Sequence, residues 1–328
     1  MKICVTGGAG YIGSHTCKAL AAAGHTVVVY DNLSTGHRHF VRWGDFVHGD
    51  IRDTARLRAC LKKYRPDGII HFAASAYVGE SVQDPGKYFH NNVAGTLSIL
   101  DAMRDEGVDD IVVSGTCAVY GQPESVPIAE TCPPRPINPY GASKLFMERM
   151  LADFAVAHGL RWMSLRYFNA AGSSPDGEIG ELHFPETHLI PRVMFAALGR
   201  IPAIDVYGTD YPTPDGTCIR DYIHVDDLAR AHILAMEYLL GGGASMALNL
   251  GTEQGSSVRE IINGVAEISG KAVPWQDRER RDGDPACLVA DAAKARKILR
   301  WHAERPLATM LEDAWTFLNT DSMNRLMH

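Results

Sequence analysis

A tyrosine and a lysine stand four residues apart in the stretch NPYGASK, residues 138 to 144. Side chains at positions i and i+4 share one face of a helix, so Lys144 can lie beneath Tyr140 and act on its acidity. Apolar residues recur at helical spacing through residue 156 and Gly159 follows as a stop signal. This pattern predicts a helix over residues 140–158.

The lysine matters because a free tyrosine, with a pKa of about 10, is a poor base at neutral pH. A cation about 4 Å away at an effective dielectric constant of about 20 contributes roughly 4 kcal/mol, which is about three pK units. We therefore expect the pKa of Tyr140 to lie near neutrality, which makes its phenol a candidate general base. Taken by itself, the pair is also consistent with an ordinary first-turn tyrosine beside a surface lysine.

Three glycines near the N-terminus, Gly7, Gly10 and Gly13, lie between a β-branched run and a helical pattern in TGGAGYIGSH. Small residues at such a turn let backbone N–H groups and a helix N-terminus approach a pyrophosphate, although a tight turn alone would also use them. Asp31 ends the next apolar run, 18 residues after Gly13, where a carboxylate can accept both ribose hydroxyls and repel a 2′-phosphate. No Arg or Lys lies between Asp31 and His37, so the sequence predicts NAD as the cofactor in preference to NADP.

The first half of the chain alternates short β-branched runs with longer helical patterns. The runs KICVT, TVVVY, DGIIHF, DIVVS and RWMSLRY are interspersed with helical patterns around residues 11–24, 86–105 and 140–158. This alternation predicts an α/β fold with a Rossmann-type doubly wound parallel sheet. Gly and Pro become more frequent after about residue 171. We therefore expect an NAD-binding domain over 1–170 and a smaller C-terminal substrate-binding region over 171–328, with some later strands and helices returning to the first domain.

Composition limits the classes of partner. The 328 residues carry a net charge of -7 without a long basic run, which disfavours a nucleic-acid partner. The seven cysteines, an odd number without a C-x-x-C pair, are expected to be free thiols, and the segment HRH at 37–39 to be a solvated loop rather than a metal site. The chain begins with a strand pattern rather than a signal peptide and has no apolar run of about 18 residues. We expect a cytoplasmic protein with no metal and no membrane partner.

The sequence resembles the extended short-chain dehydrogenase/reductase family and, within it, the UDP-glucose 4-epimerase family. The resemblance covers nearly the whole chain through, in order, VTGGAGYIGSHT, DNLSTG, HFAASAYVGESV, PYGASK, LRYFNAAG, PTPDGTCIRDYIHVDDLA and RRDGDPA. It implies NAD-dependent interconversion of UDP-glucose and UDP-galactose by transient oxidation at C4, rotation of the 4-keto intermediate and reduction on its opposite face. It also implies a homodimer formed through the helices near residues 90–104 and 144–157.

The same resemblance implies catalytic roles. Tyr140 would take the proton of the sugar 4-hydroxyl while hydride passes to NAD, with Lys144 supporting the phenolate. Thr116 would bridge the 4-oxygen and the phenolate, the alternative being a threonine satisfied by backbone alone. Sugar-nucleotide 4,6-dehydratases have Asp-Glu after this threonine, where this chain has Cys117 and Ala118. Without a second acid–base pair the keto intermediate can only be reduced again, which favours epimerisation.

Other functions stay open at this point. The chain could be an epimerase of another UDP-sugar, an N-acetylhexosamine or a pentose, or a net sugar-nucleotide oxidoreductase. It could also be a binding or regulatory protein that kept the fold and lost the reaction, since fold alone does not fix function.

The remaining site residues are also assigned by resemblance. Those placed at the cofactor are Gly7, Gly10, Tyr11, Ile12, Gly13, Asp31, Asn32, Asp50, Ile51, Phe72, Ala73, Ala74, Asn91, Ser114, Tyr140, Lys144 and Phe168. Those placed at the UDP-sugar are Thr116, Tyr140, Asn169, His188, Leu189, Tyr207, Arg220, Arg281, Asp284 and Leu288. Arg220 and Arg281 suit a diphosphate, because guanidinium groups bind phosphate in a bidentate manner. Many relatives have a lysine at the position of Ala76, so one expected phosphate contact is missing here.

Four of these and neighbouring positions carry a more specific expectation. His188 stands where some relatives have Asn, and the alternative is that it merely packs. Asp226 and Asp227 are expected to cap the following helix rather than to contact ligand. Leu288 takes a position that is a tyrosine in members restricted to plain hexoses and a smaller residue in members that also accept N-acetylated sugars. Leucine is smaller than tyrosine but branched, so we expect a graded preference with room for an acetamido group.

Overall fold

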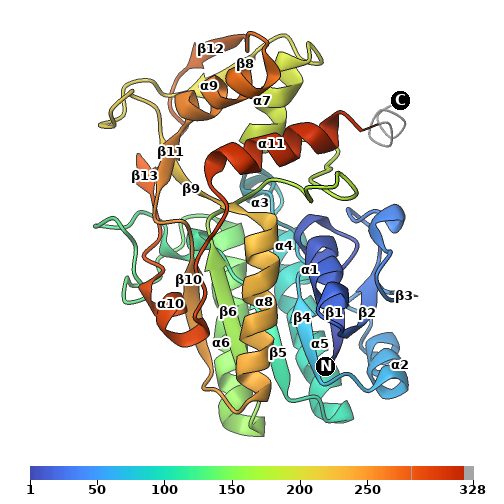
Figure 1. The fold of residues 1–328 in the computed structure, drawn as a ribbon. Coiled ribbons are helices and arrows are strands. Elements are labelled where there is room, and N and C mark those ends of the chain that lie inside the picture. Colours follow the sequence, from blue (N-terminus) through green and yellow to red (C-terminus); the bar gives the residue numbers. More distant parts are fainter. Residues whose placement is uncertain (282, 321–328) are drawn as a thin grey trace.

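A parallel sheet organises the first part of the computed structural model, which describes residues 1–281 and 283–320 (Figure 1). Its strands are β1 (Lys2–Thr6), β2 (Thr26–Asp31), β3 (Asp45–His48), β4 (Gly68–His71), β5 (Asp110–Ser114), β6 (Arg161–Tyr167) and β10 (Met246–Leu250). Within the described residues these seven strands pair in the order β10-β6-β5-β4-β1-β2-β3, and all neighbours are parallel. The predicted α/β fold with a doubly wound parallel sheet is confirmed.

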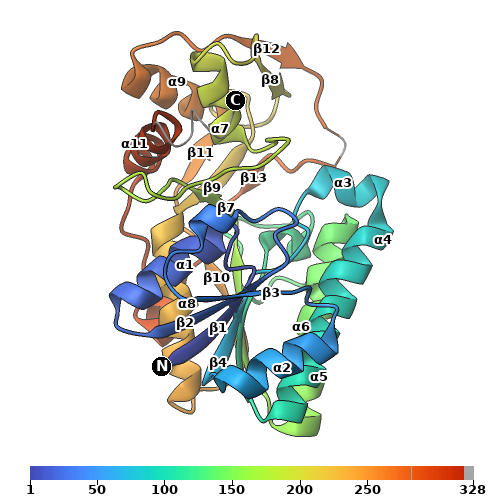
Figure 2. The same ribbon diagram turned by 90° about the vertical axis from the view of Figure 1, so that its right-hand side faces the viewer.

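Helices cover both faces of this sheet, so its strands are apolar on both sides (Figure 2). The helices are α1 (Tyr11–Ala22), α8 (Val225–Leu240) and α10 (Ala293–Leu299) on one side, and α2 (Thr54–Tyr64), α5 (Gly95–Glu106) and α6 (Pro139–His158) on the other. Leu20 of α1 and Leu228 of α8 are buried against one face. Leu100 of α5 and Leu151 of α6 are buried against the opposite face.

The predicted helix over 140–158 is α6, and its ends have local causes. Asn138 accepts a hydrogen bond from the N–H of Gly141 (2.8 Å), and Pro139 occupies the first helical position. Gly159 ends the helix with φ of 75°, a conformation that glycine adopts without strain. The helix predicted around 86–105 is present but interrupted, as α4 (Pro85–Tyr88), the π-helical η2 (Phe89–Ala94) and α5. The other short helices before α6 are α3 (Val78–Gln83) and the 3-10 turns η1 (Arg38–Phe40) and η3 (Cys117–Tyr120).

The later residues build a second layer that lies beyond the carboxyl ends of the sheet strands (Figure 1). Its strands are β7 (Asn169–Ala171), β8 (Ile204–Tyr207), β9 (Ile219–His224), β11 (Gly255–Ser257), β12 (Trp275–Arg278) and β13 (Cys287–Leu288). Its helices are α7 (Leu189–Ala197), α9 (Val258–Ser269) and α11 (Leu307–Leu318), which share a core that includes Met194, Ile261 and Leu311. The segments α8, β10 and α10 follow residue 170 in sequence but pack on the first sheet. The functional division at residue 170 stays a prediction, and residues 321–328 of the second region lie outside the described residues.

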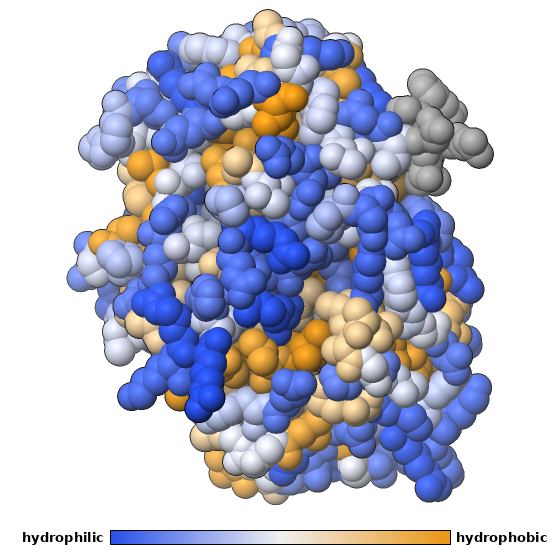
Figure 3. Space-filling view, in the orientation of Figure 1, coloured by the Kyte–Doolittle hydropathy of each residue, from blue (hydrophilic) through white to orange (hydrophobic). Residues whose placement is uncertain are grey.

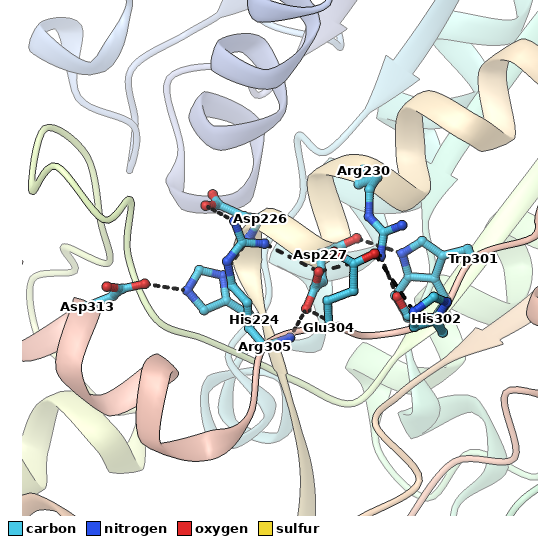
Figure 4. A network of polar contacts seen from close by, with 9 residues as sticks. All are labelled: His224, Asp226, Asp227, Arg230, Trp301, His302, Glu304, Arg305 and Asp313. Atoms are coloured by element: carbon cyan, nitrogen blue, oxygen red, sulfur yellow. Dashed lines mark hydrogen bonds and ion pairs between the residues drawn. The ribbon is translucent and has the colours of Figure 1, made fainter.

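A buried polar network joins the start of α8 to the C-terminal segment (Figure 4). The Asp227 carboxylate, fully buried, accepts hydrogen bonds from the backbone N–H groups of Glu304 and Arg305, both at 3.0 Å. His224 is the N-cap of α8, because its Nδ1 accepts the N–H of Asp226 (3.0 Å), and its Nε2 lies 3.1 Å from Asp313 of α11. The prediction that Asp226 and Asp227 cap the helix is therefore wrong. Asp227 instead holds two distant segments together.

This face of the molecule is mainly hydrophilic over the N-terminal end of α8, with hydrophobic side chains gathered below that band (Figure 3). The seven cysteines all fall within the described residues and are free thiols, as predicted. No helix within residues 1–281 and 283–320 combines the length and apolar character that crossing a bilayer requires.

Candidate active site

The glycine turn between β1 and α1 is packed so closely that side chains do not fit. A Cβ on Gly7, which has φ of +76°, would lie 2.5 Å from the backbone nitrogen of Ala73, and one on Gly13 would lie 2.2 Å from the Gly7 carbonyl oxygen. Gly10 is the N-cap of α1. It has no side chain that could cap the first N–H groups of this helix, which begins at Tyr11. This geometry fits a pyrophosphate bound at a helix N-terminus.

Asp31 lies at the carboxyl end of β2, beside this turn, and is 7% exposed. Its carboxylate accepts hydrogen bonds from the N–H groups of Ala9 (2.9 Å) and Leu33 (2.8 Å). Burial raises the pKa of Asp31, and these two hydrogen bonds oppose that rise. A carboxylate has about four acceptor sites, so two remain for ribose hydroxyls. Next to it, Asn32 Nδ2 donates to Asp50 (3.0 Å), which brings two of the predicted cofactor residues together.

The other predicted cofactor residues gather at the same edge of the sheet. Phe72 and Ala73 follow β4, and their N–H groups donate to the Thr6 carbonyl at the end of β1 (2.8 and 3.1 Å). Ser114 ends β5, and Phe168 follows β6. Ligands of open parallel sheets bind outside the carboxyl ends of the strands, which is where this set lies.

Tyr140 and Lys144 lie in the first two turns of α6, and their electrostatics differ from the prediction. Burial, opposed by a hydrogen bond with Thr116, raises the pKa of Tyr140 to about 12. Burial also lowers the pKa of Lys144 to about 8, against the opposing effect of Glu148. Lys144 is 2% exposed, and its Nζ donates to the Ser114 carbonyl (2.9 Å). The predicted near-neutral pKa of Tyr140 is wrong for the chain alone, because burial disfavours the charged phenolate.

Thr116 is buried at 6% exposure and meets two partners. Its hydroxyl oxygen accepts the N–H of Ala118 (3.2 Å), which makes Thr116 the N-cap of η3, and its side chain lowers the pKa of Tyr140 against the effect of burial. The hydrogen bond to Ala118 matches the alternative of a threonine satisfied by backbone, and the effect on Tyr140 matches the catalytic role, which stays a prediction. Cys117 lies beside this pair, and burial raises the pKa of its thiol to about 12, so it stays a neutral thiol near the phenol.

A buried ion pair that was not predicted from the sequence lies beneath Lys144. Glu148, one turn after Lys144 on α6, receives hydrogen bonds from Arg166 Nε (2.8 Å) and Ser164 Oγ (2.7 Å) on β6. The side chains of Glu148 and Arg166 are 8% and 7% exposed. The i, i+4 spacing of Tyr140, Lys144 and Glu148 was the available signal.

Asn92 of η2 is a second residue that was not predicted from the sequence. It is fully buried and contacts the amino-terminal part of α6. Its side chain accepts the Ser75 N–H (2.8 Å) and donates to the Ser75 carbonyl (3.0 Å) and to Ser143 Oγ (2.9 Å). It thereby ties the segment after β4 to the turn of α6 that carries Tyr140. The predicted residue Asn91 lies beside it and donates to the Asn92 side chain (3.1 Å).

The predicted substrate residues form a looser group on the second layer. Arg220 of β9 donates to Asp284 (2.6 Å) and to the Pro285 carbonyl (2.9 Å), and the Arg281 guanidinium lies 4.0 Å from the centre of the Tyr207 ring. Leu288 of β13 pairs in register with Arg220. Leu288 also packs on a small cluster that contains Phe168, Tyr120 and Ile128. Asn169 begins β7, in register with Tyr222 of β9.

His188 and Leu189 lie at the start of α7, where His188 is the N-cap residue. His188 Nδ1 lies 2.6 Å from the Glu181 carboxylate and 3.2 Å from that of Glu186. Burial would lower the pKa of His188, but these two carboxylates outweigh it and raise the pKa to about 10. The imidazole is 44% exposed, so it is available for a further contact.

Comparison with known proteins identifies the family. Residues 3–251 match the model of the NAD dependent epimerase/dehydratase family, and the chain belongs to this family. It is 52% identical to the UDP-glucose 4-epimerase of Rhizobium meliloti (strain 1021), over 96% of each chain. The solved structure of UDP-glucose 4-epimerase from Brucella ovis in complex with NAD is 57% identical, with a TM-score of 0.95, and the match covers 96% of this chain and 98% of that one. The UDP-glucose 4-epimerase of Stenotrophomonas maltophila, with bound NAD and formylated UDP-arabinopyranose, is 42% identical, with a TM-score of 0.96 and 99% of both chains covered.

Proposed function

We propose that this protein is an NAD-dependent enzyme that interconverts UDP-glucose and UDP-galactose by transient oxidation at C4. The observation that carries the proposal is the partly buried Tyr140, whose pKa the Thr116 side chain lowers, followed one turn later by Lys144 at the same sheet edge as the glycine turn. High identity to UDP-glucose 4-epimerases over nearly the full chain supports the same reaction. The absence of an acidic pair at Cys117 and Ala118 favours reduction of the keto sugar over elimination of water.

The chain supplies binding, orientation and proton transfer. The glycine turn and Asp31 would hold the dinucleotide, and NAD, when bound, accepts a hydride from C4 of the sugar and returns it. Tyr140 would take the proton of the 4-hydroxyl, and Thr116 would hold the hydroxyl and the phenol in line. Because the pKa of Tyr140 in the chain is about 12, Lys144 alone does not make it a base at neutral pH. The positive charge of the bound nicotinamide ring adds to that of Lys144 in favouring the phenolate.

Arg220 and Arg281 would bind the diphosphate of the substrate, with Tyr207, Asn169 and Asp284 around them. The keto sugar must rotate before it is reduced on its opposite face, so the sugar end needs fewer fixed contacts than the diphosphate end. Anchoring by charged groups on the second layer is consistent with this requirement, since charge-assisted hydrogen bonds hold one end of the ligand strongly.

The test is to incubate the purified protein with UDP-galactose and no added reductant and to measure UDP-glucose directly. Epimer formation at constant total UDP-hexose is expected. A net oxidoreductase would instead produce NADH in proportion to product, and a binding protein would produce neither. Acid release and chromatography should show copurified NAD, and a protein that is active only with NADP would contradict the role of Asp31.

We also propose a homodimer formed through η2, α5 and α6. Leu97, Phe146 and Val156 on this face are 41%, 52% and 91% exposed, and Phe146 lies against Phe89 at a ring distance of 6.1 Å. Exposed apolar side chains gathered on adjacent helices are typical of an interface. Light scattering should show a dimer for the unmodified protein and a monomer for Phe146→Glu, while a monomer at micromolar concentration for the unmodified protein would contradict the proposal.

A further inference from the structure

Four side chains with metal-binding atoms converge just before α7, in the stretch ELHFPETH at residues 181–188. They are Glu181, His183, Glu186 and His188, and their ligating atoms all lie within 4.8 Å of one another. We call this group the 181–188 cluster. No metal site was predicted from the sequence, because the spacing E-x-H-x-x-E-x-H differs from the cysteine and histidine patterns typical of zinc sites.

The distances within the cluster suit a coordination shell better than a set of hydrogen bonds. His183 Nδ1 lies 3.4 Å from Glu181 and 3.6 Å from Glu186, and it is buried without a hydrogen-bond partner among the described residues. A charge-assisted N–H to carboxylate bond would be about 2.7–2.9 Å long. A tetrahedral zinc site with bonds of about 2.0–2.1 Å separates its ligand atoms by about 3.3 Å. The 3.2 Å between His188 and Glu186 also fits this separation, and the 2.6 Å between His188 and Glu181 requires a small opening.

The charge of the cluster is compatible with a bound divalent cation. The side chains of Glu181 and Glu186 are only 10% and 5% exposed, and two carboxylates that are this buried require two compensating positive charges. Two protons on the histidines can supply them, and so can one divalent cation bound to neutral imidazoles. A cation would also engage the buried Nδ1 of His183, which the ion pairs leave without a hydrogen bond.

The cluster is also preorganised and reachable. Glu186 accepts the N–H groups of Thr187 (2.7 Å) and His188 (2.8 Å), and such outer hydrogen bonds fix a ligating carboxylate. A cavity of about 120 Å³ is lined by Glu181, His183 and Glu186 together with Phe195 and Leu318, and it provides an entry path.

We propose that the 181–188 cluster binds one divalent transition-metal ion, with zinc as the best match to two imidazole nitrogens and two carboxylate oxygens. The ion would be structural. It would fix the segment between β7 and α7 against Tyr11 and Tyr77, whose rings lie 6.5 Å and 5.8 Å from that of His183. The yellow-green chain before α7 passes close to α1 in Figure 2, which places the ion at the boundary between the two layers.

The test uses the untagged full-length protein, purified without chelator and then stripped and titrated with Zn²⁺ alone. We expect one Zn²⁺ per chain and saturable binding by calorimetry. Thermal unfolding should shift to a higher temperature with Zn²⁺. Co²⁺ should give the visible absorption of a four-coordinate ion. Mg²⁺, which prefers six oxygen ligands, should not compete.

The variant His183→Gln should weaken Zn²⁺ affinity by at least about 100-fold, since even outer-shell changes cost 10–100-fold. The matched control is His302→Gln, which removes an exposed histidine 3.8 Å from one carboxylate and should leave the affinity unchanged. Circular dichroism of both variants checks that they fold. A stripped protein that shows no saturable Zn²⁺ binding, or a His183→Gln variant that binds as tightly as the unmodified chain, would overturn the proposal and leave two imidazolium ions as the charge partners.

Discussion

The two halves of the candidate active site are held in different ways. On the cofactor side, residues at the ends of buried strands are fixed by backbone hydrogen bonds, as Asp31 is by Ala9 and Leu33. On the substrate side, side chains from separate segments hold one another, as Arg220 and Asp284 do. Arg281 is exposed.

The fold itself therefore forms the proposed cofactor half before ligand binds, whereas the side chains of the proposed substrate half can adjust. Backbone hydrogen bonds between buried elements change only if the fold changes, but ion pairs of partly exposed side chains exchange partners at low free energy. Substitutions on the cofactor side should therefore alter chemistry or folding, and those on the substrate side should alter substrate affinity and selectivity.

The largest effect is expected at Tyr140, where the two halves meet. Tyr140→Phe removes the proton acceptor and keeps the ring, so kcat should fall by at least about 100-fold, the usual worth of a general base, while NAD remains bound. Steady-state kinetics and the content of copurified nucleotide measure the two outcomes. The matched control is Tyr88→Phe, an adjacent buried tyrosine whose hydroxyl contacts Tyr77 and Glu80 instead. Retention of more than about a tenth of the activity by Tyr140→Phe would exclude the role.

The buried Lys144 should make the free energy of unfolding depend on pH. Its pKa is about 8 in the folded protein, against 10.5 for an ordinary lysine side chain, so between these values the unfolded chain binds the proton and the folded chain does not. The free energy of unfolding then rises with pH across this window, by on the order of 3 kcal/mol. Lys144→Met should lack this rise, besides losing activity and cofactor binding. Urea unfolding of nucleotide-free protein at pH 7.5 and 10 tests it, and equal pH dependence of the two proteins would contradict the buried position of the ammonium group.

Arg220 tests the other half of the comparison. Arg220→Met removes charge-assisted hydrogen bonds worth about 1.5–3 kcal/mol, so KM for UDP-galactose should rise about 10–100-fold with NAD content unchanged. The control is Arg278→Met, which breaks an exposed ion pair with Asp205 and should leave KM alone. If Arg220→Met lost NAD together with substrate affinity, the separation into two halves would fail.

Local signals explain what the sequence could predict. The glycine spacing predicted the turn at Gly7. Apolar periodicity predicted the strands of the sheet and, with Gly159 as a stop signal, the helix α6. The pKa of Tyr140 depends on burial by residues far away in sequence, which the i, i+4 spacing of Tyr140 and Lys144 does not reveal. No local pattern connects the segments that are joined by the Glu148–Arg166 pair. The same is true of the segments joined by Asp227 and residues 304 and 305. The 181–188 cluster, in contrast, has a local signal in the spacing E-x-H-x-x-E-x-H.

The smallest effect concerns sugar selectivity at Leu288. This side chain packs with Phe168 and Tyr120, and its strand pairs with β9 at Arg220, so it connects the adjustable half to the fixed one. A pocket that gains or loses a few apolar contacts discriminates by only about 1–3 kcal/mol, so we expect measurable turnover of UDP-N-acetylglucosamine beside the main UDP-galactose reaction. Leu288→Tyr fills space that an acetamido group needs and should lower kcat/KM for UDP-N-acetylglucosamine by about tenfold or more while sparing UDP-galactose. Leu288→Met, which conserves volume, is the matched control and should keep both activities. Two results would contradict this role of Leu288: no turnover of the N-acetylated sugar by the unmodified protein at saturation, or equal impairment of both substrates by Leu288→Tyr. In either case Leu288 only packs in the pocket and does not select the sugar, and the adjustable half does not include it.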